Sequence, residues 1–429
     1  MTFRSLVVRT CLVLTAAAAL ASTAVAGDSP RTAEVRVDSR LVAPSLPDRA
    51  IERVDLGLGA VDYYDTSDGP VAGRYAPQPA GVHATGDPAK ANDARRKGSE
   101  FLKKIQKKDG GWGAGNWGQP DDGAPSDVAT TAMVLLALHR DANGTDIHDA
   151  SIRKGVEYTL ASIASAPRDS AKVTTPEGTQ PQRKLGALVD THLAAMMLSE
   201  IAGTLDDETN IAMDKGFGQV VAKVQLAQNA DGSFDGNGWA PVLSNSIAAT
   251  SLMRADERGI EVDQEVLDRS EKYQAAQVAG DGSVDTSTGA GVDLYAVAGS
   301  LRTNSMGAKR KGSANTQEAT RAAEASATRV ANDADRLMAG FGSVGGEEML
   351  GYMMISDTLA EEGGDRWETW EGKVGAYLVG IQNADGSWVG HHCITSRTFT
   401  TAAAVMALGS GDYAQRQAAA KATPGPSKG

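Results

Sequence analysis

The chain has 429 residues and a formal net charge of −12, with 41% hydrophobic but only 5% aromatic residues. An acidic balance of this size disfavours nucleic acid and anionic membrane surfaces as partners, because both are themselves negatively charged. Beyond the N-terminal region no apolar stretch is long enough to span a bilayer, so no transmembrane segment is expected.

The first 26 residues have the pattern of a secretory signal peptide. Arg4 and Arg9 precede an apolar run that starts at Cys11, and the small residues 24–26 (Ala-Val-Ala) offer a cleavage site. We therefore expect a secreted or periplasmic protein. Cleavage would remove Cys11 and leave Cys393 without a partner for an intrachain disulfide.

Residues 27–86 lack a helical period and are punctuated by Pro and Gly, which predicts an irregular, extended arm or linker. From residue 87 to 411, polar-faced helical stretches alternate with apolar ones in six pairs. The composition of residues 412–429, which end in AAAKATPGPSKG, predicts a disordered tail.

The polar-faced stretches are 89–108, 146–163, 207–226, 263–278, 315–338 and 365–382. Their apolar partners are 127–139, 188–202, 246–258, 291–301, 346–360 and 395–408. The partners are apolar around most of their circumference, which indicates helices with protein on every side. Six buried helices inside six amphipathic ones predict an all-α fold, a single (α/α)6 toroid with an inner and an outer ring.

A short motif recurs at the ends of the polar-faced helices. It reads QKKDGGW at 106–112, QNADGSF at 228–234 and QNADGSW at 382–388. A degenerate copy, QVAGDGSVD, lies at 277–285. Gly accepts the positive φ that ends a helix, and Asp bonds to nearby backbone. The Gln can hydrogen-bond exposed backbone at helix ends, and the aromatic residue can pack between neighbouring units, so we interpret the motif as structural.

These motif copies and the paired helices resemble the prenyltransferase and squalene cyclase repeat superfamily, over roughly residues 87–411. The resemblance implies an α/α toroid whose lumen holds an isoprenoid or other apolar ligand. It does not by itself fix an activity, because one fold hosts many functions.

If the inner helices all run the same way, their N-termini share one mouth of the barrel. The residues expected at this mouth are Asp127, Asp190, His192, Asn245, Ser246, Asp293, Tyr295, Glu347, Glu348, His391, His392, Cys393 and Arg397. Asp127, Asp190 and Asp293 are the candidate catalytic acids. An Asp at a helix start also caps the backbone and complements the helix dipole without any catalytic role.

Squalene and hopene cyclases carry an Asp-x-Asp-Asp-Thr-Ala signature at an inner-helix start, which supplies the acid that protonates an alkene. The similar stretch in this chain is DVATTA at 127–132, where Ala129 occupies the position of the protonating Asp. Aromatic side chains, which stabilise carbocations, are also few. Classical cyclase activity is therefore disfavoured, and the enzyme class stays open.

A zinc site is the second hypothesis. Protein prenyltransferase β subunits hold zinc with an Asp and a Cys two residues apart and with a His on another helix. Asp190 and His192 have that separation, and His392 and Cys393 add ligands that zinc accepts. In the alternative interpretation, His192 is hydrogen-bonded within the lumen and Cys393 is a small buried residue.

Two classes of function remain at this point. Convergence of Asp190, His192, His392 and Cys393 on a deep lumen would favour a transferase or cyclase-like enzyme. A lumen filled by Met196, Met197, Met353 and Met354 would favour a non-catalytic scaffold that recognises a protein partner.

Overall fold

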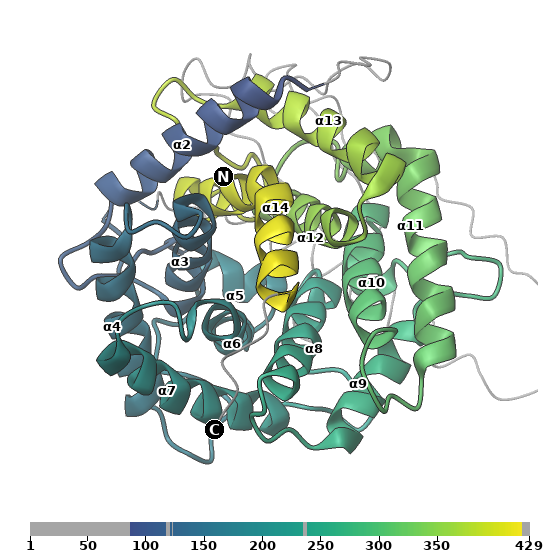
Figure 1. The fold of residues 1–429 in the computed structure, drawn as a ribbon, viewed down its shortest axis with the longest axis horizontal. Coiled ribbons are helices and arrows are strands. Elements are labelled where there is room, and N and C mark those ends of the chain that lie inside the picture. Colours follow the sequence, from purple (N-terminus) through teal and green to yellow (C-terminus); the bar gives the residue numbers. More distant parts are fainter. Residues whose placement is uncertain (1–85, 117–120, 122, 235–237, 423–429) are drawn as a thin grey trace, which may run out of the picture. The chain divides into compact units, whose positions relative to one another are not determined.

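The computed structural model describes residues 86–116, 121, 123–234 and 238–422. The predicted signal peptide, residues 27–85 of the predicted arm and residues 423–429 of the predicted tail lie outside this described part. Within it, long helices alternate between an outer and an inner ring (Figure 1). None of the described helices combines the length and the apolar character that crossing a membrane would require.

The outer ring consists of α2 (Pro88–Lys104), α4 (Asp149–Ser165), α7 (Asp207–Leu226), α9 (Gln264–Ala276), α11 (Thr316–Met338) and α13 (Gly364–Ile381). The inner ring consists of α3 (Val128–Ala142), α6 (Val189–Ile201), α8 (Pro241–Glu257), α10 (Asp293–Gly307), α12 (Gly346–Glu362) and α14 (Arg397–Ala422). A short helix, α5 (Gln180–Leu185), precedes α6, and a 3-10 turn, η3 (Ser287–Gly289), precedes α10.

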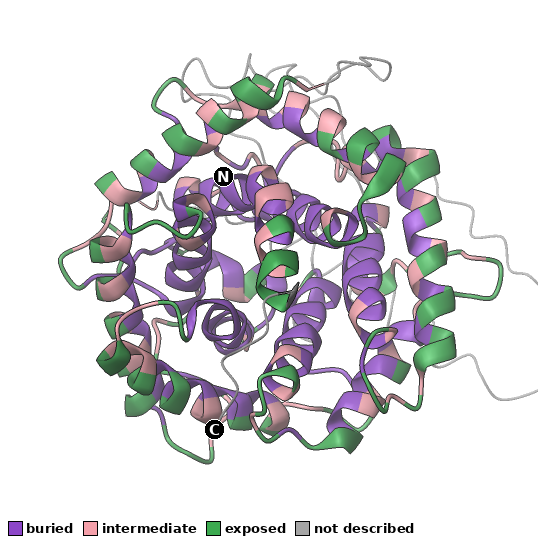
Figure 2. Ribbon diagram, in the orientation of Figure 1, coloured by how far each residue is buried: buried purple, intermediate pink, exposed green. Residues whose placement is uncertain are grey.

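The inner ring is closed. Each inner helix packs against the next one along the chain, and α14 packs against α3. Figure 2 shows the consequence, because the inner helices are buried around most of their circumference whereas the outer helices expose one face to solvent. The predicted all-α toroid of six inner and six outer helices is confirmed.

Three copies of the repeat motif tie an outer helix to the following one. The side-chain amide of Gln106 donates to the carbonyls of Gly110 and, on α4, Ser151, at 2.8 and 2.9 Å. Gln228 makes the equivalent bond to Val266 on α9 at 2.8 Å. Gln382 donates to Ala94 on α2 at 2.8 Å, so the last copy joins the end of the outer ring to its beginning.

The glycines of the motif are required by close packing as well as by the turn. Gly110, Gly232 and Gly386 have φ of 87°, 96° and 88°. A Cβ at these positions would come within 2.3 to 2.5 Å of a backbone carbonyl on the following outer helix, a separation that no side chain can accept. The motif therefore fixes the spacing between units, as its structural interpretation requires.

Two boundaries differ from the prediction. Helix α8 begins at Pro241 rather than near residue 246, because proline is well tolerated in the first turn of a helix. Helix α14 continues to Ala422, past residue 411 where the tail was predicted to begin. Tyr413 is buried, and Asp412 accepts a hydrogen bond from Arg95 on α2 at 2.6 Å, so tertiary contacts hold this extension.

Candidate functional site

The two ends of the lumen differ in chemistry. Contacts such as Ala129 with Asp190 join the first turns of neighbouring inner helices, and contacts such as Arg140 with Glu200 join their last turns. The inner helices therefore run in the same direction. We call the end with their N-termini the mouth and the opposite end the floor.

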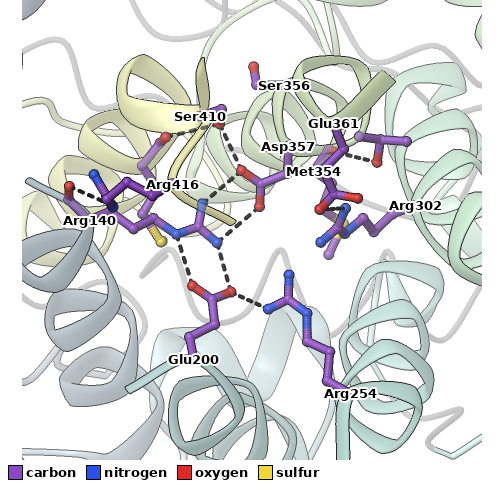
Figure 3. A network of polar contacts seen from close by, with 12 residues as sticks. Arg140, Glu200, Arg254, Arg302, Met354, Ser356, Asp357, Glu361, Ser410 and Arg416 are labelled. Carbon is purple, nitrogen blue, oxygen red and sulfur yellow. Dashed lines mark hydrogen bonds and ion pairs between the residues drawn. The ribbon is translucent and has the colours of Figure 1, made fainter. Parts of the chain in front are cut away.

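The floor is closed by buried ion pairs (Figure 3). Arg140 of α3 is fully buried and donates to Glu200 of α6 at 3.1 and 2.9 Å and to Asp357 of α12 at 2.7 and 3.0 Å. Arg254 of α8 also donates to Glu200. Ser410 of α14 completes the set with a 2.7 Å bond to Asp357. We call Arg140, Glu200, Arg254, Asp357 and Ser410 the ionic layer.

Electrostatics explain why this layer holds its charges in the interior. Burial alone would raise the pKa of Glu200, but Arg140 and Arg254 hold that pKa well below its usual value. Arginines near the C-terminal ends of inner helices also complement the partial negative charge of those ends. The ring of Tyr413 lies 4.2 Å from the guanidinium of Arg140 and covers the layer with the extension of α14.

The layer above the floor is filled by side chains. Residues three or four positions before the ionic layer on each helix face the same axis, one turn higher. These residues are Leu136, Met196, Thr250, Met354 and Met406, with exposed fractions of 0%, 6%, 6%, 2% and 0%. Met197 and Met353 are buried as well. Side chains lining an open channel would keep accessible surface, so among the described residues the lumen is packed at this height.

At the mouth, Asp127 serves as the N-cap of α3. Its carboxylate accepts from the backbone amides of Thr130 at 2.7 Å and Ala114 at 2.9 Å. Burial, together with the charge of Asp190, raises the pKa of Asp127 to about 7. The predicted acid therefore lies at an inner-helix start, but both of its oxygens are engaged with backbone.

Asp190 ties three segments together. It accepts from the amide of Ala129 at 3.0 Å, from the hydroxyl of Thr175 at 3.0 Å and from the side chain of Gln182 at 2.8 Å. Burial raises its pKa. The recess beside it has a volume of about 30 Å³, space for a water molecule rather than an isoprenoid. Asp190 thus lies against the backbone of Ala129, the position of the missing cyclase acid.

Asp293 is the first residue of α10 and lies at the mouth end, but its side chain is paired with the outer ring. Its carboxylate pairs with Arg329 at 2.9 Å and Arg336 at 2.8 Å, both on the outer helix α11. These contacts are with the outer ring, and the role of Asp293 as a catalytic acid stays a prediction.

The predicted zinc set is not assembled. Among the residues that the structure describes, no three His, Cys, Asp or Glu side chains gather closely enough to hold a metal ion. Nδ1 of His192 lies 2.8 Å from the hydroxyl of Ser244, while Nε2 of His392 lies 2.9 Å from the carbonyl of Ser343. Asp190 and His192 belong to α6, which is separated from α14 and the preceding His392 and Cys393 by α3.

A second acidic pair lies at the start of α12. Glu348 accepts from the amides of Gly345 at 2.8 Å and Phe341 at 3.1 Å and from the hydroxyl of Tyr295. Glu347 accepts from the amide of Ile394 at 3.2 Å. Burial and the charge of Glu348 raise the pKa of Glu347 to about 7.

The ionic layer is a feature that was not predicted from the sequence. Its members are single charged residues near the ends of otherwise apolar helices, such as Arg140 in ALHRDA and Glu200 in MMLSEI. A charge at the same height on several neighbouring apolar helices is the signal that would have indicated ion pairing, because such residues are rarely buried alone.

No protein-family model matches the chain, and no curated protein is similar to it. Among solved structures, two variants of type II terpene cyclase MstE from Scytonema, each in complex with geranylgeranyl dihydroxybenzoate, are similar. They are 14% and 13% identical, cover 76% of this chain and 99% and 98% of their own, and both have a TM-score of 0.33.

Proposed function

We propose that this chain is an exported, non-catalytic toroid that recognises a protein partner by its surface or mouth. The observation that carries the proposal is the packed central lumen, in which Leu136, Met196 and Met354 are almost fully buried above the ionic layer. A cyclase needs an enclosed cavity of several hundred cubic ångströms to fold an isoprenoid chain. At the height of this layer, the protein's own side chains occupy the space around the ring axis.

The polar groups of the mouth support the same proposal. Ala129 supplies no acid, and the neighbouring carboxyl of Asp190 is engaged by three donors. A general acid needs a carboxyl that can reach its substrate. The hydrogen bonds of Asp127 and Asp190 instead join the first turns of α3 and α6 to the connections around them, which suits a rigid module.

A second candidate is that the lumen stores an apolar ligand such as an isoprenoid. The observation that favours it is the methionine content of the central layer, because methionine side chains are flexible and adapt to new packing. In this alternative Met196, Met354 and Met406 would rearrange to admit the ligand. The first and second candidates make opposite predictions about bound lipid.

The test is native mass spectrometry of the purified chain, with metal analysis of the same sample and a melting scan with added geranylgeraniol. The non-catalytic proposal expects no stoichiometric lipid, no zinc and no change in melting temperature. The Ala129→Asp variant should form no cyclised product from a polyprenyl substrate. One lipid per chain, or a rise of several degrees with geranylgeraniol, would replace the first candidate by the second, and a cyclised product would restore an enzyme.

A further inference from the structure

The last part of α14 extends beyond the inner ring. The other inner helices have 13 to 17 residues, whereas α14 has 26. Residues 397–410 of α14 span the ring, since Ser410 already reaches the ionic layer at the floor. We call residues 411–422 the strap. Figure 1 shows the last turns of α14 in the middle of the ring, and Tyr413 of the strap lies against the ionic layer.

One side chain of the strap is inserted among the charges of the floor. Tyr413 is 4% exposed, and the guanidinium of Arg140 lies 4.2 Å from the centre of its ring. The charges of Glu200, Arg254 and Asp357 also act on its hydroxyl. Burial and the charge of Glu200 raise the pKa of Tyr413, so the phenol stays neutral. We call the space that this ring fills beside these four charged residues the socket.

The socket does not need the strap to keep its shape. Arg140 is fully buried and donates four hydrogen bonds to Glu200 and Asp357, at 2.7 to 3.1 Å. These bonds join inner helices, and they hold the plane of the guanidinium in one orientation. A flat, fixed cation is a platform for the negative face of an aromatic ring. The floor is therefore preorganised for such a ring whether or not Tyr413 is in place.

The strap buries less of its surface than the part of α14 that precedes it. Residues 398–407 are all buried. Within residues 411–421, by contrast, only Tyr413 and Ala414 are buried, and residues 418–421 are exposed. A segment with few buried contacts opens locally at a lower free energy than the domain unfolds.

Two polar anchors hold the strap. Asp412 pairs with Arg95 on α2 at 2.6 Å, and 41% of the Asp412 side chain is exposed. Arg416 donates to the side chain of Asn143 and, at 3.2 Å, to the carbonyl of Arg140. Ion pairs at the surface contribute little net stability, because water and salt screen them. Release of the strap therefore costs less than unfolding of the toroid.

We propose that the socket is a binding site for a phenol, that Tyr413 occupies it as an intrachain ligand, and that release of the strap opens it to an external phenol. The face of the ring would lie on the guanidinium of Arg140, and the neutral hydroxyl would lie near the carboxylates of Glu200 and Asp357, which accept hydrogen bonds. An anionic ligand is disfavoured, since these two acids already pair with Arg140. The site lies at the floor, so it does not depend on what the mouth recognises.

The probe is p-cresol, which has the side-chain ring of tyrosine. The Tyr413→Ala variant of the full chain empties the socket and leaves the bonds of Arg140 in place. A ligand of this size binds with a Kd of about 1 mM. At ~10 mM, p-cresol should therefore raise the melting temperature of Tyr413→Ala by roughly 2 °C. Tyr413→Leu is the matched control, because leucine refills the socket, and its melting temperature should not rise.

A second ligand separates the chemistry of the ring from its shape. The saturated analogue 4-methylcyclohexanol has a size and a hydroxyl position similar to those of p-cresol, but it lacks the π face that a guanidinium attracts. It should bind Tyr413→Ala several-fold more weakly. A shift in melting temperature as large as that with p-cresol would show that the socket takes any apolar ring, which would overturn the assignment to phenols.

Hydrogen exchange of the wild-type chain tests the release of the strap. Amides of residues 413–418 should exchange through local opening, and ~10 mM p-cresol should speed their exchange roughly tenfold, because it binds only the open state. Amides of residues 400–407 should not change. Unchanged exchange of the strap would overturn the proposal, even if Tyr413→Ala does not fold. Equal shifts in the melting temperatures of Tyr413→Ala and Tyr413→Leu would equally refute it.

Discussion

Replacing Glu200 by Gln tests whether the ionic layer stabilises the toroid. Glu200 accepts from both Arg140 and Arg254, and its side chain is 1% exposed. Removal of one member of a buried ion pair leaves its partners uncompensated and costs about 3–5 kcal/mol. The unfolding entropy of a domain of about 340 residues is on the order of 0.7 kcal/mol per kelvin. The melting temperature should therefore fall by roughly 4–7 °C.

The assay is calorimetric or urea-induced unfolding at pH 7, with Glu324→Gln as the control. Glu324 pairs with Arg366 on the exposed outer ring, where an ion pair contributes no more than about 1 kcal/mol. Glu200→Gln should leave the helix content of the folded protein unchanged, because the outer ring and the repeat contacts do not involve Glu200.

The pH dependence of the stability difference between wild type and Glu200→Gln supplies a second check. Because the pKa of Glu200 is lower in the folded state than its ordinary value of 4.5, its stabilisation is fully present above that pH and is lost as the pH falls through the folded-state pKa. The gap between wild type and Glu200→Gln should therefore narrow in strong acid. A variant that melts within 1 °C of wild type at pH 7 would refute the assignment of the floor as a stabilising layer.

Three further predictions concern the repeats, the mouth and a buried lysine. Gln382→Ala should destabilise the chain by about 1–2 kcal/mol, because it breaks the hydrogen bond that closes the outer ring. Gln277→Ala, in the degenerate motif copy, should cost less, since the Gln277 side chain donates within its own helical segment. Equal losses of the free energy of unfolding in urea would contradict the ring-closing role of Gln382. Since the pKa of Asp127 is raised to about 7, wild-type stability should decline as pH rises from about 4 to 7. Asp127→Asn should flatten that decline while preserving the N-cap of α3. Parallel pH profiles of stability for the two proteins would contradict this assignment to Asp127. Lys223→Met should lower the free energy of unfolding by about 2–3 kcal/mol, because the ammonium group of Lys223 donates to the carbonyls of Pro167 and Ser170 at 2.5 and 2.9 Å. Hydrogen exchange of residues 167–170 should then accelerate. Unchanged exchange there would show that this loop does not depend on Lys223.

The fold could be predicted from the sequence because its signals are local. A dozen consecutive residues show whether a helix is apolar on all sides or on one side. This pattern assigned the helices to the inner and outer rings correctly. The motif copies likewise carry their own turn chemistry, so the bonds of Gln106, Gln228 and Gln382 followed the prediction.

The site could be predicted only in part. Asp127 and Asp190 do lie at inner-helix starts, as expected from helical position. The direction in which an acid points depends on partners that are distant in sequence, and Asp293 illustrates this, since its partners Arg329 and Arg336 belong to the next outer helix. The predicted zinc ligands are not gathered in the described part of the chain for a related reason, because ring order separates α6 from α14 and no local spacing indicates that separation.

The sequence by itself determined the helices, their pairing, the turns between them and the absence of an acid at Ala129, because each of these depends on neighbouring residues. Only the tertiary structure decided whether the lumen is open. Its packing depends on side chains from five inner helices meeting at one height. Its floor depends on pairs such as Arg140 with Asp357, which are 217 residues apart. Side-chain volume and charge pairing across the ring axis, which no local pattern encodes, decide how the described part of the lumen is packed.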